Sequence, residues 1–332
     1  MTDDAPIGVL VMAYGTADGP GDIERYYTDI RGGRAPSSEH LEELRSRYEA
    51  IGNRFPLLEI TQAQADGLEA ALDREHPGAF RCYLGMKHSP PWIADGVAQM
   101  QKDGIERAVG IVMAPHWSGM SIPTYEERVR AAVEEGSGPS FSFVQAFDTH
   151  PAFIGLLAER VRDAMGQLPE SVREGAEVIF SAHSLPTRDA DEGTFRCLRC
   201  DALSCAAACR YEAGLRTTAD LVARPLGLER YSTAWQSAGR TADPWWGPPI
   251  ETAIAALGEH GVPAVVVCSA GFVADHLEIL YDLDVEARAI AEAAGLAFAR
   301  TEMPNADPSF TSMLADVVRL HLAEAEAEAS AP

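Results

Sequence analysis

The segment DHLEILYDLDVEA, residues 275–287, places acidic side chains at regular intervals. Glu278, Asp282 and Glu286 follow one another every four residues, which would stack their carboxylates along one face of an α-helix. Three like charges repel one another unless a cation lies among them, and a divalent metal ion accepts such oxygen ligands. A solvated acidic helix face is the alternative. The apolar residues between these positions indicate a helix packed into the protein, which favours a metal site.

A histidine lies in the turn SAHSLP, directly after an apolar run. Imidazole is the side chain best suited to moving protons near neutral pH. His183 is therefore a candidate proton acceptor, although a single histidine at a strand end is also commonly structural.

Four of the six cysteines lie within the thirteen residues CLRCDALSCAAAC. Cys197, Cys200, Cys205 and Cys209 have the spacing C-x2-C-x4-C-x3-C. A disulfide is not expected in the reducing compartment inferred below. Zinc sites of four cysteines usually combine two C-x2-C pairs from separate turns, so this spacing favours an iron–sulfur cluster. Zinc and free thiols stay open as alternatives.

Residues 25–54 hold six arginines and no lysine. Guanidinium groups bind carboxylates in a bidentate manner, so this segment could hold a ligand with several carboxylates. Alternatively, the arginines pair with Glu42, Glu43 and Glu49 on one solvated helix. The six are Arg25, Arg31, Arg34, Arg45, Arg47 and Arg54.

The composition excludes several classes of partner. The net charge of the 332 residues is -23, so duplex nucleic acid and anionic membranes would be repelled. No run of 18 apolar residues and no basic leader pattern is present, and we expect a cytoplasmic protein without membrane insertion. No glycine-rich nucleotide-binding motif follows an apolar run, so a dinucleotide or ATP site is not indicated.

Apolar runs bounded by turns alternate with helix-period segments along the chain, which predicts an α/β fold of parallel sheets covered by helices. Residues 8–16 resemble residues 177–185, and residues 110–127 resemble residues 265–278, which indicates two similar halves. Ligands bind beyond the carboxyl ends of such strands, so Tyr14, His116, His183 and the DHLE segment should converge on one cleft. The predicted strands are 8–15, 80–86, 108–115, 140–147, 177–184, 231–237, 264–270 and 296–301; predicted helices include 61–76, 124–136 and 276–295.

Several motifs together resemble those of the ferrochelatases, in order from Gly8 to about Met303. The matching stretches are MAYGT, YYTDIRGGRAP, RYEAIG, GMKHSPPWI, APHWS, SAHSLP, WQSAGRTADPWWGP and GFVADHLEILYDLD. The resemblance is closest to the coproporphyrin branch of Gram-positive bacteria. It implies insertion of ferrous iron, Fe2+, into coproporphyrin III to give coproheme, the penultimate step of that heme pathway. It also implies a monomer of two Rossmann-like halves with the porphyrin in the cleft between them.

The resemblance also assigns roles to residues. His183 matches the catalytic histidine, and Glu278 the glutamate that faces it across the macrocycle. Asp282 and Glu286 match a second, more exposed metal site that leads inward. Tyr14 matches a tyrosine that can ligate iron. The positions that hold propionates are matched by Arg31, Arg47 and Tyr125, which favours the ligand-binding interpretation of these arginines.

Some actinobacterial members carry a 2Fe-2S cluster on an internal cysteine segment, so the resemblance implies such a cluster on Cys197, Cys200, Cys205 and Cys209. It further implies that coproheme passes to the next enzyme of the heme pathway. The family pattern I-G-G-x-S-P-L reads IGNRFPL here, so Asn53 replaces a glycine and Phe55 a serine that would bind a propionate.

We therefore expect an N-terminal half over residues 1–150, a C-terminal half over 151–325 with the cysteine segment at about 194–212, and a flexible tail over 326–332. Insertion of Fe2+ into protoporphyrin IX, or of another metal into another tetrapyrrole, is the nearest alternative. A non-catalytic heme or metal carrier and an iron–sulfur electron-transfer protein belong to other classes. The second of these would need a further redox cofactor site.

Overall fold

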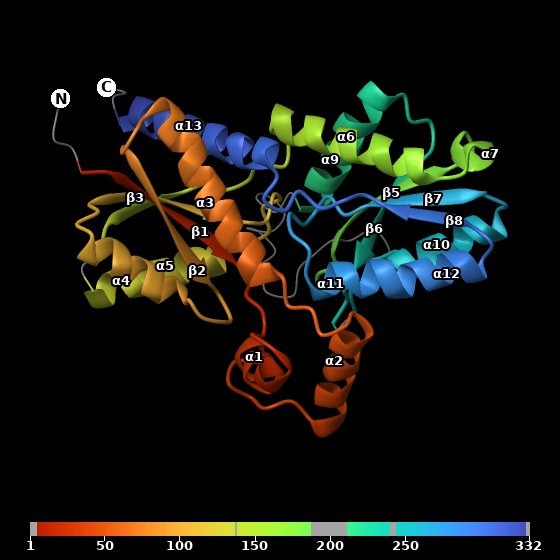
Figure 1. The fold of residues 1–332 in the computed structure, drawn as a ribbon, viewed down its shortest axis with the longest axis horizontal. Coiled ribbons are helices and arrows are strands. Elements are labelled where there is room, and N and C mark those ends of the chain that lie inside the picture. Colours follow the sequence, from red (N-terminus) through yellow and green to blue (C-terminus); the bar gives the residue numbers. More distant parts are fainter. Residues whose placement is uncertain (1–4, 137, 187–210, 240–243, 330–332) are drawn as a thin grey trace.

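Two four-stranded parallel sheets form the centre of the protein in the computed structural model, which describes residues 5–136, 138–186, 211–239 and 244–329 (Figure 1). The first sheet has the order β2-β1-β3-β4 and the second the order β6-β5-β7-β8. All eight predicted strands are present, which confirms the α/β fold of two similar halves. Their bounds are β1 Ile7–Ala13, β2 Phe80–Met86, β3 Arg107–Val112, β4 Ser140–Phe143, β5 Glu177–His183, β6 Tyr231–Gln236, β7 Ala264–Cys268 and β8 Ala297–Arg300.

The central strands of the two sheets are buried on both faces. β1 pairs with β2 and β3, and β5 pairs with β6 and β7 in the same arrangement. Helices cover both sides of each sheet, so these strands are continuous apolar runs instead of alternating ones. The pairing of β5 with β6 places His183 directly beside Gln236. The register thus brings a polar amide next to the candidate catalytic histidine.

Helices form the outer layers of both halves (Figure 1). The C-terminal helix α13 packs on α3 of the first half and also contacts α6. Gly67 permits this approach, since a Cβ there would lie 2.8 Å from the Thr311 side chain. Helix α13 extends past the predicted start of the tail at residue 326, because its alternating Ala and Glu residues have high helix propensity. The outer helices are α3 Leu57–Glu75, α4 Ile93–Lys102, α5 Ile122–Gly136, α6 Pro151–Gln167, α7 Glu170–Arg173, α9 Tyr211–Leu226, α10 Ile250–Glu259, α12 Arg288–Ala293 and α13 Pro308–Ala329.

Helices α1 (Ile23–Ile30) and α2 (Ser38–Ala50) project below the two sheets in Figure 1. A small apolar cluster joins them to the second half through Leu280 of helix α11 (Leu277–Leu280). The six arginines of residues 25–54 are therefore divided between two helices and their loops, and do not share one solvated helix face. The cluster fixes α2 against the acidic segment, with Arg47 facing it.

The acidic segment 276–295 is not the uniform α-helix that its spacing predicts. It consists of α11, a π-helix η2 (Asp282–Ala287) and α12. The Tyr281 carbonyl accepts hydrogen bonds from Val285 at 3.1 Å and from Glu286 at 3.0 Å, so one extra residue enters the turn. The wider turn buries Leu283 and Ala287 in the core. The carboxylates of Glu278, Asp282 and Glu286 therefore do not follow a regular α-helical row.

Candidate active site

A cavity of about 530 Å³, here the central cavity, lies between the two halves at the carboxyl ends of the strands. Tyr14 follows β1, His116 follows β3, His183 ends β5, and Glu278 lies in the segment after β7. All four line the central cavity, as expected for residues that follow the carboxyl ends of parallel strands. The convergence predicted from the sequence is therefore confirmed.

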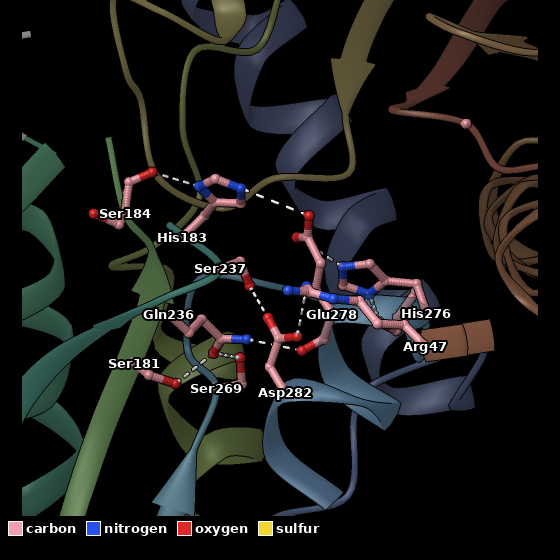
Figure 2. Close-up of polar contacts among 12 residues, drawn as sticks. Arg47, Ser181, His183, Ser184, Gln236, Ser237, Ser269, His276, Glu278 and Asp282 are labelled. Atoms are coloured by element: carbon pink, nitrogen blue, oxygen red, sulfur yellow. Dashed lines mark hydrogen bonds and ion pairs between the residues drawn. The ribbon is translucent and has the colours of Figure 1, made fainter. Parts of the chain in front are cut away.

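His183 and Glu278 lie together on one wall of this cavity (Figure 2). The expectation that they face each other across the macrocycle is therefore wrong, because a gap of 3.7 Å between their side chains has no room for a ring. The Nε2 atom of His183 lies 3.7 Å from Oε1 of Glu278, and Nε2 of His276 lies 3.5 Å from Oε2. The other ring nitrogen of His183, Nδ1, bonds the Ser184 carbonyl and so carries a hydrogen. Nε2 is consequently the nitrogen of His183 that exchanges protons.

The charges of this pair stabilise each other. Burial by itself lowers the pKa of His183, but the Glu278 carboxylate outweighs burial and raises it. Burial conversely raises the pKa of Glu278, but His183 and His276 outweigh it and hold that pKa well below its ordinary value. At neutral pH the pair is therefore an imidazolium facing a carboxylate.

Gln236 connects the two elements that carry this pair (Figure 2). Its Nε2 donates to the backbone carbonyl of Glu278 at 3.1 Å, and its Oε1 accepts from Ser181 at 2.8 Å and Ser269 at 3.0 Å. Its own carbonyl accepts from the Ser184 amide at 2.7 Å. Gln236 was not among the predicted site residues. Its place in the WQS motif, in register with His183, is the signal that could have found it.

Tyr211, the first residue of α9, also holds His183 in place. Its hydroxyl donates to the His183 carbonyl at 3.1 Å. Its ring packs against Trp235 and Trp246, with centroids 5.5 and 5.9 Å away. The main chain of the candidate catalytic residue is thus fixed by an aromatic cluster that the sequence analysis missed.

A second cavity, of about 540 Å³, adjoins the first and is lined by Glu251, Asp282 and Glu286; we call it the acidic cavity. Asp282 is 3% exposed, and its Oδ2 accepts a hydrogen bond of 2.5 Å from Ser237. Burial, and after it the Glu278 charge, raises the pKa of Asp282 to about 7. Burial and the Glu286 charge likewise raise the pKa of Glu251, which the sequence analysis missed because it lies on the separate helix α10.

The predicted metal residues are divided between the two cavities. His183 and Glu278 line the central cavity, Glu286 lines the acidic cavity, and Asp282 lines both. Within the parts of the chain that the structure describes, no group of three or more His, Cys, Asp or Glu side chains is arranged to hold a metal ion by itself. The arrangement is a succession of carboxylates leading toward His183.

The predicted propionate-binding residues differ in position. Arg47 and Tyr125 line the central cavity, whereas Arg31 lies just beyond Ile30, which does line it. Tyr14 is 43% exposed and faces the cavity from the first half. Gly15 after it has φ of +104°, and a Cβ there would lie 2.7 Å from the Ser89 hydroxyl, so a glycine is required at this turn.

The two departures from the family pattern have separate structural settings. Asn53 has φ of +53°, in the left-handed region where asparagine is among the tolerated replacements for glycine. Phe55 stacks on Tyr48, with ring centroids 4.4 Å apart, in the apolar cluster that joins α1 and α2 to the second half. At position 55 a ring contact thus takes the place of a hydroxyl group.

The four clustered cysteines, Cys197, Cys200, Cys205 and Cys209, lie outside the described residues. The described chain ends at Pro186, which pairs with Trp245, and resumes at Tyr211. The described residues on either side, Pro186 and Tyr211, both lie near His183.

The Ferrochelatase family profile matches residues 6–322. The chain belongs to the ferrochelatase family. It is 42% identical to the coproporphyrin III ferrochelatase of Halalkalibacterium halodurans over 322 residues, 96% of this chain and 98% of the relative. It is also 42% identical to the coproporphyrin III ferrochelatase of Bacillus subtilis over 314 residues, 94% of this chain and 96% of the relative.

The fold of this ferrochelatase is also similar to that of solved chelatase structures. SirB from Bacillus subtilis with Fe3+ aligns with a TM-score of 0.59 at 11% identity, over 97% of this chain and 98% of SirB. SirB from Bacillus subtilis subspecies spizizenii with cobalt aligns with a TM-score of 0.54 at 11% identity, over 95% of each chain. At this identity the likeness concerns the fold. In the described residues, no helix is both long and apolar enough to cross a bilayer.

Proposed function

We propose that this protein inserts Fe2+ into coproporphyrin III to give coproheme, a lyase-class reaction of heme biosynthesis. The observation that carries the proposal is the His183–Glu278 pair in the wall of the central cavity, next to Asp282, which lines both this cavity and the acidic cavity. The near full-length similarity to proteins named coproporphyrin III ferrochelatase supports this substrate.

The reaction removes two protons from pyrrole nitrogens and the water from hydrated Fe2+. The macrocycle would lie in the central cavity with His183 and Glu278 on one face and Tyr14 opposite. His183 accepts protons at Nε2 once the imidazolium has released its own, and the Glu278 carboxylate stabilises the charge that results. Tyr14 would guide the metal or ligate the iron of the product from the other face.

The iron substrate would reach the ring through the acidic cavity, passing Glu286, Asp282 and Glu278 in turn. Carboxylate oxygens suit a divalent cation that gives up its water in steps. Asp282 is the only one of the three that lines both cavities, so it is the point of transfer between them. His183 and Glu278 then receive the metal where the pyrrole protons leave.

Coproporphyrin III has four propionates, and cationic and hydroxyl groups at the rim of the cavity would bind them. Arg31, Arg47 and Tyr125 are proposed to do so, and the Lys87 ammonium adds a further charge in the cavity wall, 4.9 Å from the Tyr125 ring. Protoporphyrin IX, with two propionates, would leave part of this charge unpaired. Coproporphyrin III is therefore the preferred substrate.

The deciding experiment is an anaerobic assay with Fe2+ and either coproporphyrin III or protoporphyrin IX, followed by absorbance. We expect faster insertion into coproporphyrin III, and loss of insertion with retained porphyrin binding in His183→Ala. Binding of porphyrin without spectral change after Fe2+ addition would indicate a carrier. Faster turnover of protoporphyrin IX, or of another metal and tetrapyrrole, would overturn the substrate assignment.

We also propose that Cys197, Cys200, Cys205 and Cys209 hold a 2Fe-2S cluster, as in some actinobacterial members. When bound, such a cluster would tie the segment at four points, and insertion involves no net electron transfer, so a structural or sensing role follows. The purified protein should be reddish-brown and contain iron and acid-labile sulfide in roughly equal amounts. Zinc in place of iron, or the absence of both metals, would refute the cluster.

The remaining proposals concern the cellular setting. A monomer in the cytoplasm, with the halves 1–150 and 151–325, would hand coproheme to the next enzyme of the heme pathway. Size-exclusion chromatography with light scattering tests the monomer, and transfer of coproheme to that enzyme tests the hand-over.

A further inference from the structure

Arg47 lies in the wall that separates the central cavity from the acidic cavity. Only four residues among those that the structure describes line both cavities, namely Arg47, Ser237, Ala238 and Asp282. Arg47 is the cation of this set and Asp282 the carboxylate. The charge of either side chain therefore acts on a ligand in the central cavity and on a ligand in the acidic cavity.

Arg47 is turned toward acidic side chains (Figure 2). Its Nη2 lies 3.0 Å from Oε1 of Glu43, and its Nη1 lies 3.8 Å from Oδ1 of Asp282. The guanidinium also lies 5.2 Å from the centroid of the Tyr281 ring. These contacts hold Arg47 over the point where the two cavities meet.

The contact with Asp282 is an ion pair without a hydrogen bond. The buried Oδ1 atom of Asp282 has no hydrogen-bond partner in the described part of the chain, while Oδ2 is held by Ser237. A guanidinium 3.8 Å away neutralises Oδ1 without the directional bonds of a fork geometry. This pairing therefore exchanges readily for a carboxylate that Arg47 can bind in a bidentate manner.

Each substrate has a different effect on this pair. A divalent cation in the acidic cavity is repelled from Asp282 as long as the guanidinium lies beside it. A porphyrin propionate in the central cavity offers Arg47 a better partner on the opposite side. We propose that Arg47 covers Asp282 in the porphyrin-free protein and moves to a propionate when porphyrin binds, which makes the Asp282 carboxylate available to Fe2+.

This inference rests on the proposed function and adds an order to it, in which porphyrin binding precedes tight metal binding. Because coupling between two binding sites is reciprocal, the metal should strengthen porphyrin binding by the same factor. The order has a chemical advantage, since iron reaches the inner carboxylate only when a ring is present to receive it.

The test measures binding instead of turnover. Co2+ serves as an air-stable probe for Fe2+, and zinc coproporphyrin III serves as a fluorescent ring that keeps all four propionates while its nitrogens are already occupied by a metal. Calorimetry gives the Co2+ dissociation constant with and without this porphyrin, and fluorescence gives porphyrin binding separately. Arg47→Gln is compared with Arg45→Gln, a matched change on the same helix, where Arg45 pairs only loosely with Glu42 at 3.9 Å.

We expect the porphyrin to tighten Co2+ binding by about 5–50-fold in the wild type and in Arg45→Gln, within the usual range of coupling between sites. Arg47→Gln should bind Co2+ tightly without porphyrin and gain less than about 2-fold from it. Equal Co2+ affinity with and without porphyrin in the wild type would overturn the inference while leaving iron insertion intact. An Arg47→Gln protein that keeps the full enhancement would overturn it too. Absence of porphyrin binding to the wild type would refute the proposed function itself, and this inference with it.

Discussion

The carboxylate of Glu278 is shared by two histidines, with Nε2 of His183 at 3.7 Å from one oxygen and Nε2 of His276 at 3.5 Å from the other. The two histidines approach from different elements, since His183 ends β5 and His276 precedes α11. A single acidic side chain thus contacts both imidazoles, and its charge raises the pKa of His183. Changes at Glu278 should therefore alter proton transfer even where the porphyrin still binds.

We predict that Glu278→Gln lowers the pKa of His183 toward or below its ordinary value of about 6.5. Burial alone lowers this pKa, and the substitution removes the charge that raises it in the wild type. NMR titration of 13C-labelled histidine measures the change, with the signal assigned through His183→Ala. Glu286→Gln, at the far end of the acidic segment, is the control and should leave the midpoint unchanged. An unchanged midpoint in Glu278→Gln would mean that the two side chains do not interact in solution.

The carboxylates should differ in their effect on kinetics. Glu278→Gln should reduce kcat for insertion by about 10²–10⁴-fold, the range for a group that takes part in proton transfer. Asp282→Asn and Glu286→Gln should mainly raise the KM for Fe2+, because they line the cavity through which the metal would arrive. Steady-state kinetics with varied Fe2+ at saturating porphyrin separates these effects. Equal loss of kcat in all three variants would contradict the proposed metal route.

Asp282→Asn should stabilise the protein at pH 8 more than at pH 5. Burial raises the folded-state pKa of Asp282 to about 7, above its unfolded value of about 3.9. The ionised carboxylate therefore costs stability, starting near pH 4 and reaching its full cost above pH 7. We expect the gain in unfolding free energy to be larger at pH 8 by roughly 1–3 kcal/mol. Urea denaturation at the two pH values measures it, and an equal gain at both would show that the charge of Asp282 is not the cause.

Gln236→Met should reduce kcat about tenfold or more while changing the KM for porphyrin little. The variant keeps the size of the side chain but removes the bonds to Ser181, Ser269 and the Glu278 carbonyl. A misplacement of about 1 Å at the reacting groups is sufficient for such a loss. Gln62→Met on the exposed face of α3 is the control, since its amide donates to Asp66 on the same helix and, among the described residues, to no group of the candidate site. Full activity in Gln236→Met would show that the amide does not position Glu278.

Cys205→Ser should lose visible colour and soluble yield, because removing one ligand would release a segment that a cluster ties together. The protein that does fold should keep its preference for coproporphyrin III. The measurements are the absorption spectrum, the yield after lysis and the ratio of rates with the two porphyrins. Cys82→Ser, which changes a thiol far from this segment in sequence, is the control. A colourless Cys205→Ser protein with wild-type yield would refute the structural role.

The strands, and the position of the cavity at their carboxyl ends, can be predicted from the sequence because buried parallel strands appear in it as continuous apolar runs. Runs such as residues 264–268 are apolar throughout. Ligand-binding and reactive side chains lie beyond the carboxyl ends of such strands. The π-helix at Asp282–Ala287 leaves no such pattern. Its extra residue is set by packing of Leu283 and Ala287 and by two bonds to one carbonyl, and the spacing of Glu278, Asp282 and Glu286 is the same with or without it.

The supporting residues were missed for a different reason. Gln236 and Tyr211 act on backbone carbonyls through uncharged groups, and many glutamines and tyrosines in any chain do something similar. Glu251 joins the acidic cavity from a helix that is remote in sequence from the other carboxylates. Only the three-dimensional arrangement distinguishes these residues from others of the same type.

The hydrogen bond from Tyr211 to the His183 carbonyl also bears on how this family can evolve. The Leu185 carbonyl accepts a hydrogen bond from the Trp246 amide, and the Tyr211 hydroxyl donates to the His183 carbonyl, so described residues hold both of these points in place. Since a longer chain between two fixed points adds little entropic cost, segments of different length and content could join these points without displacing His183. A cysteine-bearing segment could be gained or lost between these two points as a replaceable insert, while the chemistry beside it is inherited unchanged.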